Sequence, residues 1–403
     1  MLLDDLSLIK CIGTGTFGEV YLTSKKGSEN KLATKKISKK YMSNPKYKKY
    51  IENEINILKG VSHSNIIKLY EVKETPYFYF LVMELCNGGN LSNCLEEYIN
   101  KYKNPFSEEI VQFLMNQIIS AIKYLHNKNI LHRDIKLDNI LINFESEIDK
   151  NNLDILKATI KIIDFGFARH LSSSELASSI LGSPLNMDPG ILEKLIKLKN
   201  KMDYSETYEY DQKADIWSLG TICYQMLTGK SAFEAKNLQD LVNKIEVGKY
   251  FLSTNLSKET CSFLNGMLKY DLKKRLTADQ LLEHPFLRKP YNLFTKISDN
   301  YKEIDFIEIN IKKTMNFKIP QPKLIGNSVE ESEESEENKK NEENEENENN
   351  KNNININNLF LDALYNINDD FIYIEPLLIP IIYGNKPNTI NNIFNTKEKE
   401  YYN

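Results

Sequence analysis

The sequence predicts an α+β protein with two lobes, a small antiparallel β-rich N-terminal lobe and a larger, mainly α-helical C-terminal lobe. Over residues 1–90, apolar and polar residues alternate in short runs, which is typical of half-buried strands. From Ser107 onwards, the apolar residues recur instead at helical spacing. Hydrophobic residues make up 41% of the 403 positions, so the chain can bury a sizeable core.

The N-terminal lobe is expected to combine one helix with short strands. The helix is predicted over Tyr47–Lys59, where apolar residues at positions 51, 55 and 58 share one face. Period-two alternation predicts strands at Leu6–Ile12, Glu19–Thr23, Lys31–Ile37, Ile66–Val72 and Tyr77–Met83. In the C-terminal lobe, a long core helix is predicted from one apolar stripe, formed by Ile110, Phe113, Leu114, Ile118, Ala121, Ile122 and Leu125.

Composition separates one folded domain from a C-terminal region. A stretch of Glu, Asn and Lys with almost no apolar residues cannot bury enough surface to offset chain entropy, so we expect it to be disordered. Apolar residues return over 359–383, which makes the last part of the chain a candidate docking segment for the folded body or a regulatory partner. The expected parts are a domain at 1–288 (lobes at about 1–85 and 86–288), an extension at 289–326, an acidic disordered linker at 327–358 and a tail at 359–403.

Charge and cysteine usage exclude several classes of protein. The net charge is -4, but residues 327–351 carry eleven Glu and three Lys, or -8, which leaves +4 for the rest. Nucleic acid is therefore not expected as a partner, because no global basic field exists. No run of 18 apolar residues occurs, so no transmembrane segment is expected. The five Cys residues show no paired spacing, which favours a reduced, cytoplasmic protein over a disulfide framework or a zinc site.

A glycine motif lies between the first two predicted strands, at Gly13-Thr14-Gly15-Thr16-Phe17-Gly18. Glycine lacks a Cβ atom, so a hairpin of this kind can lay its backbone N–H groups over phosphates. A dinucleotide-binding motif of the same spelling requires a helix directly after the glycines, and a strand follows here. Alone, the motif is also compatible with an ordinary glycine-rich turn.

The most specific motif is His132-Arg133-Asp134-Ile135-Lys136-Leu137-Asp138-Asn139, followed by Asp164-Phe165-Gly166 after an apolar strand. Asp134 can accept the proton of an attacking hydroxyl, while Asn139 and Asp164 can ligate magnesium. Two further candidates precede them: Lys35 on the third strand and Glu54 on the helix, which can pair so that Lys35 holds phosphates.

These motifs, in this order, resemble the eukaryotic protein kinases over residues 1–288. The resemblance implies the bilobal kinase fold with its helix C, ATP and Mg²⁺ as cofactors, and protein substrates. It assigns catalysis to Asp134, Lys136, Lys35 and Glu54, and the metal to Asn139 and Asp164. It assigns ATP binding to Ile12, Gly13, Gly15, Gly18, Val20, Ala33, Lys35, Met83, Glu84, Cys86 and Leu141.

The resemblance also implies supporting roles. Met83 corresponds to the gatekeeper, and Glu84-Leu85-Cys86 to the hinge whose backbone holds adenine. Asp215-Ile216-Trp217 is expected to anchor the catalytic loop. A regulatory spine is expected from Leu58, Leu69, His132 and Phe165.

Features of the second half favour a serine/threonine kinase. Lys136, two residues after Asp134, and Gly182-Ser183-Pro184 are the forms that these kinases carry. Arg133 beside Asp134 suggests control by phosphorylation of the activation segment, with Ser179 as the best candidate site and Ser172, Ser173, Ser174 and Ser178 as rivals.

Three stretches are similar to the autophagy-initiating ULK-type kinases: KIIDFGFARHL, SSILGSPLNM and KADIWSLGTICYQMLTGKSAFEAKNLQDL. A polar insertion between Asn143 and Lys157 is also similar. Calcium-dependent and AMP-activated-type kinases remain alternatives, although no EF-hand pattern is found in the tail.

Two departures from the family pattern stand out. The family's Ala-Pro-Glu is here Asp188-Pro189-Gly190, so the Glu that pairs with a buried Arg, here Arg275, is missing. An unpaired buried Arg is costly, unless Glu193 or Asp188 substitutes. The segment from 191 to 211 is also longer than usual. A catalytically weak pseudokinase scaffold is therefore the alternative to an active enzyme.

Overall fold

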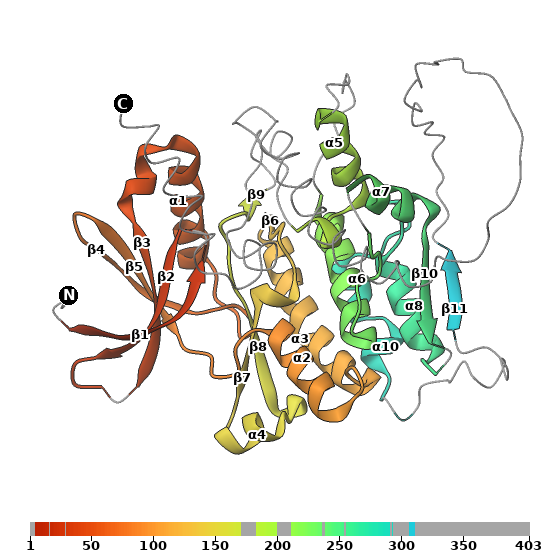
Figure 1. Ribbon diagram of the computed structural model, residues 1–403, viewed down its shortest axis with the longest axis horizontal. Coiled ribbons are helices and arrows are strands. Elements are labelled where there is room, and N and C mark those ends of the chain that lie inside the picture. The colour runs from red at the N-terminus through yellow and green to blue at the C-terminus, as the bar shows by residue number, and fades with distance from the viewer. Residues whose placement is uncertain are drawn as a thin grey trace, which may run out of the picture.

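The computed structural model describes residues 5–290, apart from positions 16, 29, 171–182, 200–210, 236–237 and 254, together with residues 292 and 306–310. The strands of the first part form one lobe and most helices form the other (Figure 1). The predicted α+β class with two lobes is confirmed. The acidic linker and the tail lie outside the described residues.

The smaller lobe is built on an antiparallel sheet with the strand order β1-β2-β3-β5-β4. Its register places Val20 opposite Lys35 and Ala33 opposite Met83, so residues expected to surround a nucleotide share neighbouring strands. The strands are β1 (Leu6–Gly15), β2 (Gly18–Lys25), β3 (Lys31–Ser38), β4 (Leu69–Glu74) and β5 (Phe78–Glu84).

Several predicted element ends shift by one to three residues, as in β1, which continues to Gly15, and at the start of β4 the shift also changes the pairing. The run from Ile66 was expected to be part of a strand, but β4 begins only at Leu69. Ile66 instead forms an isolated bridge with Ile162, and the Ile67 N–H donates to the Ile162 carbonyl at 3.0 Å. Alternation alone could not distinguish these pairings. The consequence is a backbone connection from the smaller lobe to the strand that precedes Asp164.

Helix α1 (Pro45–Gly60) packs against the sheet after a short 3₁₀ turn at Lys39–Ser43 (Figure 1). Its apolar face buries Ile51, Ile55 and Leu58, as the spacing predicts. Glu54 is 3% exposed on the same helix, which is unusual for a carboxylate and requires a partner.

The larger lobe is arranged around helices α3 (Glu108–Asn127) and α6 (Gln212–Thr228). Ser107 caps α3 by accepting the Ile110 N–H at 3.3 Å, and the apolar stripe of α3 is buried apart from the half-buried Phe113. Most of α6 is buried, including Trp217 at 0% exposure. The other helices are α2 (Leu91–Tyr102), α4 (Glu147–Asn152), α5 (Pro189–Lys199), α7 (Leu238–Val247), α8 (Lys258–Met267), α9 (Ala278–Leu282) and α10 (Pro285–Arg288).

Short strand pairs complete this lobe. Strands β7 (Ile140–Phe144) and β8 (Ala158–Ile162) form a hairpin that carries the polar insertion, which folds as α4. Tyr102 and Lys101 of α2 donate to carbonyls at the end of α4, so the insertion is tied to the lobe. The other pairs are β6 (Ile130–Leu131) with β9 (Arg169–His170), and β10 (Lys249–Ser253) with β11 (Phe306–Asn310) of the C-terminal extension; 3₁₀ turns lie at Leu137–Asn139, Ile155–Lys157 and Pro184–Asn186.

Two findings bear on the expected class of protein. All five cysteines lie in the described part of the chain and are free thiols. Within that same part, no helix is both long enough and apolar enough to cross a membrane.

Candidate active site

Lys35 and Glu54 form a buried ion pair that joins β3 to α1. The distance from Lys35 Nζ to Glu54 Oε1 is 2.6 Å, and the two side chains are 11% and 4% exposed. Burial raises the pKa of Glu54, Lys35 opposes that rise, and the negative charge of Asp164 adds to it. The structure thus brings together two residues that the sequence places on separate elements, and Asp164 lies close enough to Glu54 for its charge to act on it.

The carboxylate of Asp134 is the centre of a polar cluster in the catalytic loop. Lys136 Nζ lies 3.1 Å from Asp134 Oδ2, and the Asn139 side-chain amide donates to the same oxygen at 2.8 Å. Ser183 donates to the other oxygen, Oδ1, from its backbone N–H at 3.2 Å and from its hydroxyl at 3.3 Å. Asp134 itself is only 3% exposed. Donors on both oxygens fix the orientation of this carboxylate.

Asp215 of α6 fixes the backbone that precedes Asp134. Its Oδ2 accepts the His132 N–H and its Oδ1 accepts the Arg133 N–H, both at 3.0 Å. Arg133 has φ of 70°, a left-handed conformation that a non-glycine residue adopts only when its surroundings impose it. The two bonds to Asp215 supply that constraint. His126 of α3, which lies in no recognisable motif, contacts Asp215 Oδ2 at 2.9 Å.

This anchor leads to a prediction about pH. Burial tends to raise the pKa of Asp215, but the hydrogen bond with His126, the charges of His126 and His132 and the Arg133 N–H hold it below its ordinary value of 3.8. A lowered pKa stabilises the folded state above the unfolded pKa, and this contribution is lost as pH falls through the folded pKa. We therefore expect Asp215→Asn to lower the free energy of unfolding at pH 7, and the gap to wild type to narrow below pH 3.8. Urea unfolding measured across pH tests this, and a gap independent of pH would contradict it.

Asp164-Phe165-Gly166 is held by contacts from both lobes. Asp164 has φ of 63°, and its Oδ1 accepts the Gly166 N–H at 3.2 Å. The Phe165 ring lies edge-on to the His132 ring at a centroid distance of 5.2 Å, which joins two members of the expected spine. Asn53 of α1, another residue that no motif selected, donates to the Ala168 carbonyl at 2.6 Å.

The donor set suits magnesium. The Asn139 amide uses its N–H₂ on Asp134, so its oxygen is the atom left for a cation. Mg²⁺ in phosphoryl-transfer sites takes one or two side-chain ligands and completes its shell with substrate phosphates and water. No cluster of three or more His, Cys, Asp or Glu side chains that could hold a metal occurs in the described part of the chain.

The residues expected around adenine line the strands at the lobe junction. Ala33 and Met83 are strand partners, and Leu141 bridges to Asn90 at the start of α2. The Glu84 side chain is engaged by Lys161 at 2.9 Å and by the Lys68 N–H at 2.7 Å. Burial raises the pKa of the Cys86 thiol to about 12, which favours the protonated thiol at neutral pH.

The glycine motif forms the turn between β1 and β2, and its last glycine has a packing role. A Cβ atom on Gly18 would lie 1.8 Å from the carbonyl oxygen of Lys36 in the neighbouring strand. We expect Gly18→Ala to push the start of β2 away from β3 and to lower the free energy of unfolding by about 1–3 kcal/mol. Gly60→Ala is the control, because nothing lies within 4 Å of its Cβ position. Equal stability of the two variants in thermal unfolding would contradict this reasoning.

The remaining predictions concern the phosphorylation sites, the segment after Gly190 and the partner of Arg275. Ser179 and its rivals lie outside the described residues. The segment after Gly190 begins as helix α5, and residues 200–210 are not described.

Arg275 is paired: its Nη1 lies 2.5 Å from Asp188 Oδ2, whereas Glu193 accepts a hydrogen bond from Tyr270. Of the two substitutes left open by the sequence, Asp188 is therefore the partner of Arg275.

Comparisons with known proteins agree with this geometry. Residues 6–287 match a family model described as protein kinase domain. The chain is 36% identical over 284 residues to serine/threonine-protein kinase 33 of Bos taurus, covering 69% of this chain and 54% of that protein. It is 32% identical over 317 residues to calcium-dependent protein kinase 4 of Plasmodium berghei, covering 78% and 54%. It is 36% identical over 281 residues to serine/threonine-protein kinase ULK1 of Homo sapiens, covering 68% and 24%.

The chain thus spans about half the length of the first two relatives and about a quarter of the third. The match to the family model covers more than half of the chain. With the Lys35–Glu54 pair, the Asp134 cluster and the two-lobed fold, it shows that this chain belongs to the protein kinase family.

Proposed function

We propose that this protein is an ATP-dependent serine/threonine kinase, which transfers the γ-phosphate of ATP to Ser and Thr hydroxyls of proteins. The observation that carries the proposal is the buried Asp134 carboxylate, held by Lys136, Asn139 and Ser183. Phosphoryl transfer depends mainly on positioning and on neutralisation of charge, and these contacts provide both.

Each side chain has a definite task in this proposal. Asp134 accepts the proton of the attacking hydroxyl, and Lys136 neutralises charge on the phosphoryl group beside it. Lys35, oriented by Glu54, binds the phosphates of ATP under the glycine motif. Asn139 and Asp164 would hold Mg²⁺, which when bound neutralises the phosphate charge.

The choice of Ser/Thr over Tyr rests on Lys136 and Ser183, which both contact Asp134. The test is incubation with labelled ATP, Mg²⁺ and a generic protein substrate, followed by phosphoamino-acid analysis. Phosphoserine and phosphothreonine are expected. Phosphotyrosine as the main product would refute the specificity. Nucleotide binding without any transfer would favour the alternative, a pseudokinase scaffold.

Within the family, we propose a ULK-like signalling kinase with an autophagy role and a cytoplasmic location. The sequence stretches and the folded insertion α4 support this subfamily, and the free cysteines support the location. The kinase 33 and calcium-dependent kinase relatives are about as similar as the ULK relative, so a calcium-regulated kinase is the competing subfamily. Activity that depends on Ca²⁺ in the purified chain would favour that competitor.

Regulation and substrate choice extend the proposal. Ser179 is the proposed activating phosphosite, and residues 359–383 are the proposed docking segment for the kinase body or a regulatory partner.

The Asn90 side chain caps α2 by accepting the Asn93 N–H at 2.8 Å. Because Asn90 is uncharged where basophilic kinases often carry an acid, we propose no strong preference for an upstream Arg. A peptide array that selects Arg three residues upstream would refute this.

A further inference from the structure

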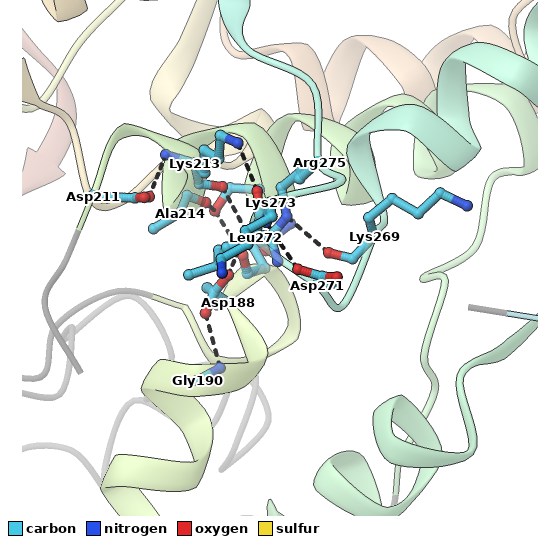
Figure 2. A network of polar contacts seen from close by, with 12 residues as sticks. Asp188, Gly190, Asp211, Lys213, Ala214, Lys269, Asp271, Leu272, Lys273 and Arg275 are labelled. Atoms are coloured by element: carbon cyan, nitrogen blue, oxygen red, sulfur yellow. Dashed lines mark hydrogen bonds and ion pairs between the residues drawn. The ribbon is translucent and has the colours of Figure 1, made fainter. Parts of the chain in front are cut away.

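The carboxylate of Asp188 connects the end of the activation segment to the core of the larger lobe. One oxygen, Oδ2, lies 2.5 Å from Arg275 Nη1, and the other, Oδ1, accepts the Gly190 N–H at 2.8 Å (Figure 2). The Asp188 carbonyl accepts the N–H groups of Ile191 and Leu192, both at 3.1 Å. Asp188 therefore both precedes and caps helix α5, at the end of a helix where negative charge is favoured.

Arg275 is held through its Nε and Nη1 atoms and through its contact with the Trp217 ring, whereas its Nη2 atom is buried without a hydrogen-bond partner in the described part of the chain. Its side chain is 0% exposed, and its guanidinium lies over the Trp217 ring at 5.1 Å. Its Nε donates to the Lys269 carbonyl at 2.9 Å and its Nη1 to the Lys213 carbonyl at 2.7 Å (Figure 2). These partners are backbone carbonyls and a ring. Among the described residues, Asp188 is the carboxylate in direct ion-pair contact with this buried cation, and the charge of Arg275 also acts on Asp211.

The short segment from Ser183 to Asp188 links Asp134 of the catalytic loop to Arg275 in the core of the larger lobe. Ser183 is bonded to Asp134, and Asp188 follows five positions later. Between them, Ser218 of α6 donates to the Asn186 carbonyl at 2.6 Å. The segment 183–188 is thus pinned at Asp134, on α6 and at Arg275, so loosening one end changes the placement of Ser183 against Asp134.

We propose that Asp188 is a positioning residue for phosphoryl transfer. It supplies, from the N-terminal cap of α5, the negative charge that related kinases supply from a glutamate two residues later. The inference rests on the proposed kinase function. The family's Ala and Glu are exchanged here for Asp188 and Gly190, so the acid is moved rather than lost. The moved acid combines two tasks, pairing with Arg275 and capping α5.

The relocation can be tested by moving the charge back. Asp188→Asn keeps an oxygen for the Gly190 N–H but removes the charge that faces Arg275. We expect about 100-fold lower kcat/KM for a protein substrate, because small misplacements of reacting groups have effects of this size. ATP affinity is expected to be unchanged, since the Lys35–Glu54 pair is not involved. The double variant Asp188→Ala/Gly190→Glu restores the family's order and is expected to recover most of the lost activity.

Glu193→Gln is the matched control, because it removes the other acid that the sequence left as a candidate. It is expected to keep wild-type kcat/KM. Wild-type activity in Asp188→Asn, or no recovery in the double variant despite normal ATP binding, would overturn the proposal.

Amide hydrogen exchange separates this proposal from the kinase function on which it rests. Asp188→Asn is expected to speed exchange over residues 183–194, and Glu193→Gln is not. If wild type transfers no phosphate but this difference appears, the anchoring stands and the proposed function fails. If wild type is active and exchange over 183–194 is the same in wild type and Asp188→Asn, the anchoring is wrong.

Discussion

Asp134→Asn is expected to reduce phosphoryl transfer by about 10²–10⁴-fold, the range that a general base contributes. Asparagine has nearly the same shape and can still accept from Ser183, but it cannot take up the proton of the attacking hydroxyl. ATP affinity is expected to stay near that of wild type, because Asp134 contacts the catalytic loop and Ser183 rather than the phosphate-binding Lys35. Single-turnover transfer and nucleotide binding, measured side by side, check both expectations.

The control for this variant is Asp138→Asn. Asp138 lies in the same motif but is exposed, and its carboxylate is not part of the Asp134 cluster. It is expected to transfer phosphate at the wild-type rate. Transfer by Asp134→Asn at the wild-type rate would remove Asp134 from the mechanism.

Lys35→Met is the second substitution with a large expected effect. It removes the charge that we propose holds the phosphates, and a fixed charge of this kind contributes about 10²–10³-fold to the rate. It also leaves Glu54 buried without its partner, which costs about 3–5 kcal/mol of folding free energy when a buried pair is broken. We therefore expect loss of transfer together with a lower free energy of unfolding.

The double variant Lys35→Met/Glu54→Gln separates these two effects. Removing the second charge as well is expected to restore most of the stability, since no unpaired charge remains in the core. Transfer is expected to stay absent. Denaturant unfolding and phosphate transfer are the two measurements. Recovery of transfer in the double variant would show that Lys35 acts only through folding.

The site residues that could be predicted from the sequence are those that lie in short motifs. Asp134 and Asn139 are five positions apart, so a short motif contains both ends of their hydrogen bond. Lys35 and Glu54 are 19 positions apart, on a strand and a helix whose periodicity could be predicted separately. Fold class follows in the same way, because strand alternation and helical spacing are local properties.

The contacts that sequence reasoning missed join distant positions. Ser183 and Asp134 are 49 positions apart, His126 and Asp215 are 89 apart, and Asn53 and Ala168 are 115 apart. Ser183 lies in a motif that the sequence singles out, but the motif does not reveal its contact with Asp134. Histidine and asparagine are common on helices and loops, so no motif selects His126 or Asn53. Asp188 and Glu193 were equal candidates for the ion-pair partner of Arg275, because both are far from Arg275 in the sequence. Only the packing of α5 against the larger lobe decides between them.

The pairing of β10 with β11 was also absent from the prediction. Residues 306–310 were assigned to the C-terminal extension without a structure, because a single short apolar run does not reveal its partner strand. Strand pairing depends on which edge the tertiary fold leaves open, and the open edge here is β10.

The central claim is that the Asp134 cluster is an active phosphoryl-transfer site, and ATP turnover by the wild-type chain tests it most directly. The measurement is transfer of labelled γ-phosphate to a Ser/Thr protein substrate in the presence of Mg²⁺, for the chain as purified and for Ser179→Glu. We expect transfer by at least one of these proteins and none without Mg²⁺. ATP binding without transfer by either protein would contradict it, and would indicate a kinase fold that serves as a scaffold.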